Sequence, residues 1–118
     1  MKKFSFVALL VLACLWSCEY DALAPKPIEL PDVISFATDL APVLEANCAT
    51  CHSGALAPNL KPSDSYKALV NGGYVDTNDP ENSELITKIN VPHPSSDPLS
   101  LKEKAMLLKW IEDGAKNN

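Results

Sequence analysis

Hydrophobic residues recur at helical spacing in the segment that precedes Cys48. They fall at i, i+4, i+7 and i+8, with a polar residue at i+11: Phe36, Leu40, Val43, Leu44 and Asn47. This stripe predicts an amphipathic helix that begins near Ser35, a suitable N-cap, and leads straight into Cys48. Pro42 lies on another face, so it either kinks the helix or marks its first turn.

A short helix is expected in the segment PSDSYKALVNGG. Either Ser63 or Ser65 can cap its N-terminus, and the helix is predicted to run through Val70. Gly72 and Gly73 then provide the stop, because glycine favours helix ends.

A second short helix is expected in the segment DPENSELITKI. Asp79 is its predicted cap, and Pro80 suits the first helical position, where no amide donor is needed. The buried face is expected to consist of Leu85, Ile86 and Ile89.

The last predicted helix has the clearest start and end. Ser100 and Glu103 have the spacing of a capping box, and the segment LKEKAMLLKWIED runs from there to Gly114, a natural stop. At 100° per residue, one apolar face contains Leu101, Ala105 and Leu108, with Leu107 and Ile111 beside it. A second seam contains Met106 and Trp110. A helix that is apolar on two sides is expected to pack against two partners.

No segment alternates convincingly between apolar and polar residues as a strand would. The fold class is therefore predicted to be all-α, with long loops over residues 53–62 and 90–99. A chain of 118 residues has room for a single domain, and nothing in it repeats. A domain of this size buries only about 60–65% of its chain surface, so its core needs an additional staple.

The first seventeen residues are predicted to be an export signal. Lys2 and Lys3 form a short basic region, and the apolar run over residues 4–16 is too short to span a bilayer. The sequence LWSC then resembles the lipobox of bacterial lipoproteins, which implies that Cys18 is lipidated and becomes the first mature residue. Trp16 is bulky for this motif. VLAC, ending at Cys14, is a rival cleavage site, and an ordinary signal with a free cysteine is a further alternative.

Residues 18–34 are predicted to be a lipid anchor followed by a tether. Pro25, Pro27 and Pro31 interrupt regular structure in this segment. Pro-rich chains extend by about 3.1 Å per residue, so about 15 residues reach roughly 45 Å. This length would hold a domain formed by residues 35–118 away from a membrane surface.

The chain is acidic and contains no arginine. Its formal net charge is −5, and removal of the first seventeen residues leaves 8 lysines against 15 carboxylates, or −7. This balance disfavours nucleic acid and anionic membrane surfaces as partners. It is compatible with a partner that has a basic docking patch, or simply with a solvated acidic surface.

The segment CATCH places Cys48, Cys51 and His52 within five positions, which three kinds of site can explain. A thioredoxin-like dithiol requires the cysteines at a helix N-terminus after a strand, whereas this pair follows the C-terminal end of a helix. A zinc site would use these three residues and His93, but the adjacent Cys51 and His52 project differently and no second ligand pair is present. A covalently attached haem requires C-x-x-C-H, in which the cysteines bond two vinyl groups and the histidine ligates the iron. Of the three, the haem interpretation fits an exported, otherwise cysteine-poor and helical chain best.

Three segments together make the chain similar to the class I monohaem cytochromes c, in particular the small lipid-anchored bacterial ones. They are SFATDLAPVLEANCATCH, APNL and LSLKEKAMLLKWIEDGAKN, within residues 35–118. The resemblance implies a class I cytochrome c fold, in which the first and last helices cross beside a covalently bound haem c. APNL is similar to the Gly-Pro-Asn-Leu of that family, which implies that the Pro58 carbonyl accepts a hydrogen bond from His52 Nδ1 and raises its basicity as a ligand.

The sixth iron ligand departs from the commonest pattern of this family, which is a Met before the last helix. His93, followed by Pro94, stands at the corresponding place, and Pro92 and Pro94 stiffen the backbone around it. His93 is therefore the candidate distal ligand. Met106 is an alternative ligand or a residue that packs near the haem, and an open iron is a third possibility.

The tyrosines of the middle segment are secondary candidates. Tyr66 and Tyr74 are each able to hydrogen-bond a haem propionate, although a half-buried structural role is the simpler expectation for both.

The function implied by these residues is one-electron transfer at a membrane surface outside the cytoplasm, facing the periplasm or the cell surface. An iron with two strong axial ligands is closed to small-molecule substrates, so we expect an electron carrier with redox protein partners rather than an enzyme. The alternatives are a haem enzyme or gas sensor with an open iron site, and a lipoprotein domain without redox activity. No arginine or paired carboxylates support peroxidase chemistry. We also expect the chain without haem to be largely unfolded.

Overall fold

The structure is a computed structural model that describes residues 26–91, 93 and 98–118. The predicted signal peptide, Cys14, Cys18 and the first part of the tether lie outside the described residues. Residues 26–33 contain no helix or strand, and Ile34, with 3% of its surface exposed, is the first buried residue. Within the described ranges, no helix is long and apolar enough to cross a membrane.

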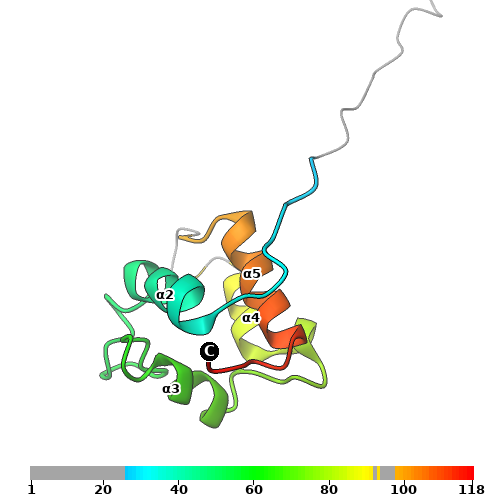
Figure 1. Ribbon diagram of the computed structural model, residues 1–118. Helices are drawn as coiled ribbons and strands as arrows, with labels where there is room; N and C mark the ends of the chain where they lie inside the picture. The colour runs from blue at the N-terminus through cyan, green and yellow to red at the C-terminus, as the bar shows by residue number, and fades with distance from the viewer. Residues whose placement is uncertain (1–25, 92, 94–97) are drawn as a thin grey trace, which may run out of the picture.

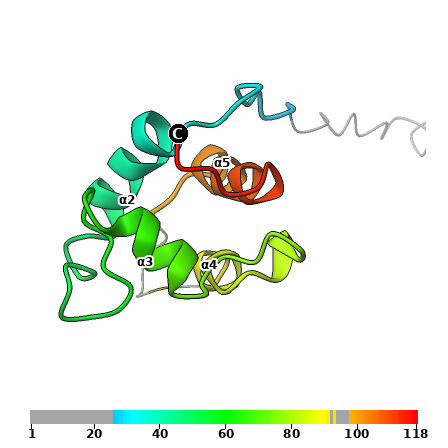
Figure 2. The same cartoon turned by 60° about the horizontal axis from the view of Figure 1, so that its bottom comes forward.

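The regular structure of the described residues is entirely helical (Figures 1 and 2). The elements are the π-helical turn η1 (Phe36–Leu40), α2 (Ala41–Asn47), α3 (Ser65–Asn71), the 3₁₀ turn η2 (Pro80–Asn82), α4 (Glu84–Ile89) and α5 (Leu101–Glu112). The all-α prediction is therefore confirmed for this part of the chain.

The first helix begins at the predicted cap. Ser35 Oγ accepts a hydrogen bond from the Thr38 amide at 3.4 Å. Pro42 lies in the first turn of α2 rather than at a kink within it. Before this proline, the Ala41 amide reaches the Phe36 carbonyl, five residues back, in a widened turn. A proline lacks the amide that would continue the preceding turn, which explains the change of helix type at this point.

The two short central helices differ from their predicted starts. Asp64 is the N-cap of α3, so neither Ser63 nor Ser65 caps it, whereas the stop at Gly72 is confirmed. The helix predicted from Asp79 onward is divided into η2 and α4, because Ser83 between them is extended (φ −50°, ψ 139°).

Ser83 has a bonding role that explains this break. Its hydroxyl accepts a hydrogen bond from the Asp76 amide at 2.9 Å and donates one to the Asp76 carbonyl at 3.2 Å. The side chain thus closes the loop before α4 and is not available to cap that helix. Leu85 and Ile86 are buried as predicted, and Ile89 is half-buried.

Helix α5 has the predicted capping box. The Glu103 carboxylate accepts from the Ser100 amide at 2.7 Å, and Ser100 Oγ accepts from the Glu103 amide at 3.2 Å. Gly114, at φ +95°, provides the stop. The buried face consists of Leu107, Trp110 and Ile111. The prediction for Leu101 was wrong: it is 76% exposed, because it lies in the first turn, before the helix reaches the core.

An aromatic cluster joins η1, α3 and α5. Phe36 packs edge-on against Tyr66, with ring centroids 5.2 Å apart, and lies 5.1 Å from the ring of Trp110. The Tyr66 hydroxyl donates to the Ala115 carbonyl at 3.0 Å, and Trp110 Nε1 donates to the Lys116 carbonyl at 2.9 Å. The first and last helical segments therefore contact each other, and the residues after α5 are held against both.

Asn118 links the end of the described chain to the start of η1, as Figure 1 shows near the label C. Its side-chain Oδ1 accepts from the Phe36 amide at 3.0 Å, and its Nδ2 donates to the Ile34 carbonyl at 3.4 Å. Its backbone carbonyl accepts from the Ala37 amide at 2.9 Å and from Ser35 Oγ at 2.8 Å. Asn118 thus satisfies amides at a helix start that have no partner within the helix.

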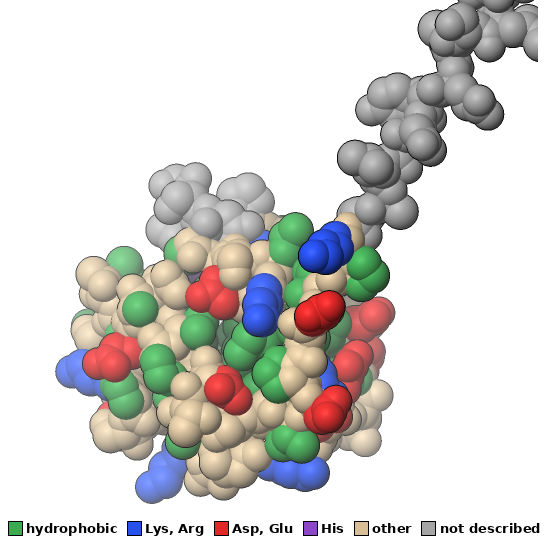
Figure 3. Space-filling view, turned by 45° about the horizontal axis from the view of Figure 1, so that its top comes forward, with side chains coloured by type: hydrophobic (Ala, Val, Ile, Leu, Met, Phe, Trp, Pro, Cys, Tyr) green, Lys and Arg blue, Asp and Glu red, His purple; other side chains and the backbone are tan. Residues whose placement is uncertain are grey.

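The charged side chains on the face shown in Figure 3 are mixed in sign. Acidic and basic groups are interspersed with apolar ones, and no single-sign patch covers this face. It therefore lacks the basic stripe that is typical of nucleic-acid-binding surfaces.

Candidate functional site

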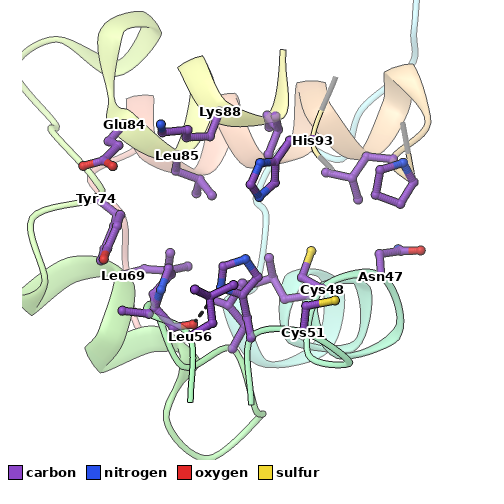
Figure 4. A pocket seen from close by; sticks show the side chains of 18 residues that line it. Asn47, Cys48, Cys51, Leu56, Leu69, Tyr74, Glu84, Leu85, Lys88 and His93 are labelled. Atoms are coloured by element: carbon purple, nitrogen blue, oxygen red, sulfur yellow. Dashed lines mark hydrogen bonds between the residues drawn. The ribbon is translucent and has the colours of Figure 1, made fainter. Parts of the chain in front are cut away.

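A cavity of about 450 Å³ lies between the loop that follows α2 and the segment around α4 (Figure 4). This volume is within the range of about 300–1,000 Å³ typical of ligand and cofactor sites. The wall is largely apolar and includes Leu44, Leu60, Leu69, Leu85, Ile89 and Leu99. Because these residues come from α2, α3, α4 and the loops beside them, the folding of the helices creates the cavity.

Cys48 and Cys51 lie together at one end of this cavity (Figure 4). Cys48 is the C-cap of α2, and the chain continues in a tight turn in which the amides of Cys51 and His52 both donate to the Cys48 carbonyl, at 3.2 and 2.9 Å. This turn brings both cysteines to the same edge of the cavity. Both are free thiols, Cys48 half-buried and Cys51 exposed.

The surroundings of Cys48 are unfavourable for a thiolate. Burial raises the pKa of the Cys48 thiol above its usual value, and the nearby Glu103 carboxylate raises that pKa further. The position at the C-terminal end of α2 acts in the same direction, since helix C-termini disfavour negative charge. These features oppose a thioredoxin-like reactive cysteine, which needs a lowered thiol pKa.

His52 is oriented by the loop that follows it. Its Nδ1 lies 3.2 Å from the Pro58 carbonyl oxygen, and its backbone carbonyl accepts from the Leu60 amide at 2.7 Å. A carbonyl can only accept, so this contact requires the proton on Nδ1 and leaves the Nε2 lone pair available. A histidine in this tautomer is prepared to ligate a metal through Nε2.

His93 faces the same cavity from the opposite wall, where it follows α4 (Figure 4). The ring centroids of His52 and His93 are 6.1 Å apart, and the ring planes are inclined by 36°. If one ion lay between the rings, its two metal–nitrogen bonds of about 2 Å each would take up most of this separation. About 1 Å would remain on each side, which is roughly the distance from a ring nitrogen to the centre of its ring. The centroid separation is therefore long enough for one ion to lie between the two imidazoles.

The ligands of a tetrahedral zinc site do not converge. Within the described residues, no group of three or more His, Cys, Asp or Glu side chains is arranged to hold a metal ion. The cysteines lie at one end of the cavity and the histidines face each other across it. This arrangement suits a planar group with its own in-plane ligands better than a bare ion.

Two further sequence candidates lie outside the cavity. Met106 is half-buried against the core and is not among the described residues that line the cavity. Tyr66 is engaged in the aromatic cluster and in its bond to Ala115. Tyr74, by contrast, is part of the cavity wall. Pro92 and Pro94, which flank His93, lie outside the described residues.

Glu84 and Lys88 are cavity residues that the sequence patterns did not indicate. They lie four residues apart on α4, so they share one face of that helix. Their only signal in the sequence is this spacing, which is equally typical of a solvent-exposed helix face.

Comparison with known proteins identifies no relative: no protein-family model, curated protein or solved structure matches this chain.

Proposed function

We propose that residues 35–118 form a class I cytochrome c domain with a single covalently attached haem c. The domain would act as a one-electron carrier, tethered through Cys18 to a membrane surface outside the cytoplasm. The observation that carries this proposal is the apolar cavity in which His52 and His93 face each other at a centroid separation of 6.1 Å.

The residues around the cavity fit such a cofactor. Cys48 and Cys51, at one end, would form the two thioether bonds. His52, held by the Pro58 carbonyl, would be the proximal ligand, and His93 would be the distal ligand. When bound, the haem supplies an iron that gains and loses one electron.

The protein's own part is to hold the iron's surroundings constant during this change. His52 and His93 close both sides of the site, so neither a substrate nor a gas finds an open position. The leucines of the wall would limit the contact of the bound group with water. The Pro58 carbonyl, 3.2 Å from His52 Nδ1, would hold the His52 proton on that nitrogen and leave Nε2 for the iron. Two histidine ligands, without a methionine, would give a potential below that of Met/His cytochromes.

The partner is proposed to be a redox protein with a basic docking patch. After removal of residues 1–17, the chain has a net charge of −7. Opposite charge on a partner would accelerate encounter without adding much affinity, which suits a transient electron-transfer complex.

The proposal is tested by a visible spectrum of the full chain matured in a periplasm that attaches c-type haem. We expect low-spin spectra in both redox states, little change with carbon monoxide or cyanide, and haem that stays with the chain after denaturation. Without the two thioether bonds, Cys48→Ala/Cys51→Ala should retain no haem.

Two results would contradict this assignment. A wild-type protein that carries no haem would refute the cytochrome proposal. A high-spin haem that binds carbon monoxide readily would favour the alternative of a sensor or enzyme with an open iron.

The anchor is tested separately. Labelled fatty acid should be incorporated into the full-length protein and into Cys14→Ala, but not into Cys18→Ala. Labelling that depends on Cys14 instead would move the cleavage site to the rival position.

A further inference from the structure

Tyr74 and Lys88 lie at the end of the cavity that is remote from Cys48 and Cys51 (Figure 4). Among the described residues that line the cavity, Lys88 is the one lysine, and no arginine occurs in the chain. Neither the Lys88 ammonium nor the Tyr74 hydroxyl has a hydrogen-bond or ion-pair partner within the described residues. Two hydrogen-bond donors thus lie at one end of a largely apolar wall.

The position of Tyr74 is determined by both neighbouring helices. Its backbone carbonyl accepts from the Leu85 amide in α4 at 2.9 Å. At Gly72, the C-cap of α3, a Cβ atom would clash with the Ala68 carbonyl oxygen and would also lie 2.9 Å from the Tyr74 ring. Gly72 therefore does more than end a helix: it makes room for the tyrosine ring at the cavity wall. These two contacts fix the backbone and the ring of Tyr74 beside the cavity.

A lysine ammonium and a tyrosine hydroxyl at the same end of the cavity suit a ligand group that accepts hydrogen bonds and carries negative charge. Lys88 is exposed and Tyr74 is half-buried, so both donors lie where a carboxylate could also meet solvent. The opposite end of the cavity holds the two thiols that would bond the vinyl groups. We propose that Tyr74 and Lys88 bind the propionate carboxylates of the haem and thereby hold that edge of the ring at the end of the cavity remote from the cysteines. This inference rests on the proposed function.

Glu84 lies at the same end of the cavity and opposes an anion there (Figure 4). Because Glu84 and Lys88 are neighbours on α4 with opposite charges, neutralising each should have opposite effects on a bound carboxylate. Lys67, exposed on α3, is outside the cavity wall and provides a matched lysine control.

The test is the propionate bending band in the resonance Raman spectrum of the matured holoprotein, because its frequency responds to hydrogen bonds on the carboxylates. Tyr74→Phe and Lys88→Gln each remove a donor and should shift the band towards weaker hydrogen bonding. Lys67→Gln should leave the band unchanged, and Glu84→Gln should not weaken it.

An unchanged band in both Tyr74→Phe and Lys88→Gln would overturn the inference, as would an equal shift in Lys67→Gln. Failure of the inference is distinguishable from failure of the proposed function. If the wild-type protein carries no haem, the proposed function fails. If haem is attached and low-spin but the band does not respond, only the assignment of Tyr74 and Lys88 fails.

Discussion

Replacing Asn118 by alanine should lower the free energy of unfolding, because Asn118 holds the start of the helical segment that leads to Cys48. The change removes the bond from the Phe36 amide to Oδ1, at 3.0 Å, and the contact from Nδ2 to the Ile34 carbonyl, at 3.4 Å. The two bonds to the Asn118 backbone carbonyl are retained. The Phe36 amide lies at the start of η1, where loss of an N-cap costs about 1 kcal/mol.

The Nδ2 contact adds little, because its length of 3.4 Å exceeds the usual donor–acceptor distance of about 2.7–3.2 Å for an N–H···O hydrogen bond. We therefore expect the free energy of unfolding to fall by about 1–1.5 kcal/mol. In a domain of this size the melting temperature falls by roughly 4–8 °C for each kcal/mol. The assay is thermal and guanidinium unfolding of the matured protein, followed by far-UV circular dichroism.

Two variants separate the Oδ1 bond from other effects of the substitution. Asn118→Asp keeps an acceptor near the helix start, where negative charge is favourable, and should retain most of the stability. Asn117→Ala changes an exposed neighbour for which no side-chain bond occurs and should alter stability by less than about 0.5 kcal/mol. The reasoning is refuted if Asn118→Ala is as stable as Asn117→Ala, or if Asn118→Asp loses as much as Asn118→Ala.

Three further predictions concern the ligand, the core and the haem. His93→Met should raise the midpoint potential, because a Met ligand favours the reduced iron, whereas Met106→Leu should leave the potential unchanged. An unchanged potential in His93→Met would exclude His93 as a ligand. Ser65→Ala should stabilise the protein by about 1 kcal/mol in guanidinium unfolding, because the Ser65 hydroxyl is buried and has no hydrogen-bond partner among the described residues. Clear destabilisation would mean that this hydroxyl has a partner. Cys48→Ala/Cys51→Ala, which cannot attach haem, should lose most of its far-UV helix signal, because a cavity of about 450 Å³ is too large to stay empty in so small a core. Full native helix content in this variant would contradict the prediction.

The local patterns were most informative where neighbours in the chain determine the structure. The capping box of Ser100 and Glu103 and the stop at Gly114 depend on hydrogen bonds and backbone angles within a few residues, and all were predicted correctly. The cap of α3 was not, because Ser63, Asp64 and Ser65 are all suitable by residue type. In the structure Ser65 is buried as the first residue of the helix, and Asp64 precedes it as the N-cap without a side-chain cap bond.

The candidate site divides in the same way. The spacing of Cys48, Cys51 and His52 is a local property, and together with the predicted export signal and the helical pattern it led to the proposal of a haem attachment site from the amino-acid sequence. That His93 faces His52 across a cavity, that Met106 does not line it, and that Tyr74 rather than Tyr66 does, depend on contacts between helices far apart in the chain. The hydrogen bonds of helix caps and turns join residues that are three to five positions apart, so they leave a pattern in the sequence. A cavity wall forms only when separate helices pack together, so the residues that line it share no such pattern.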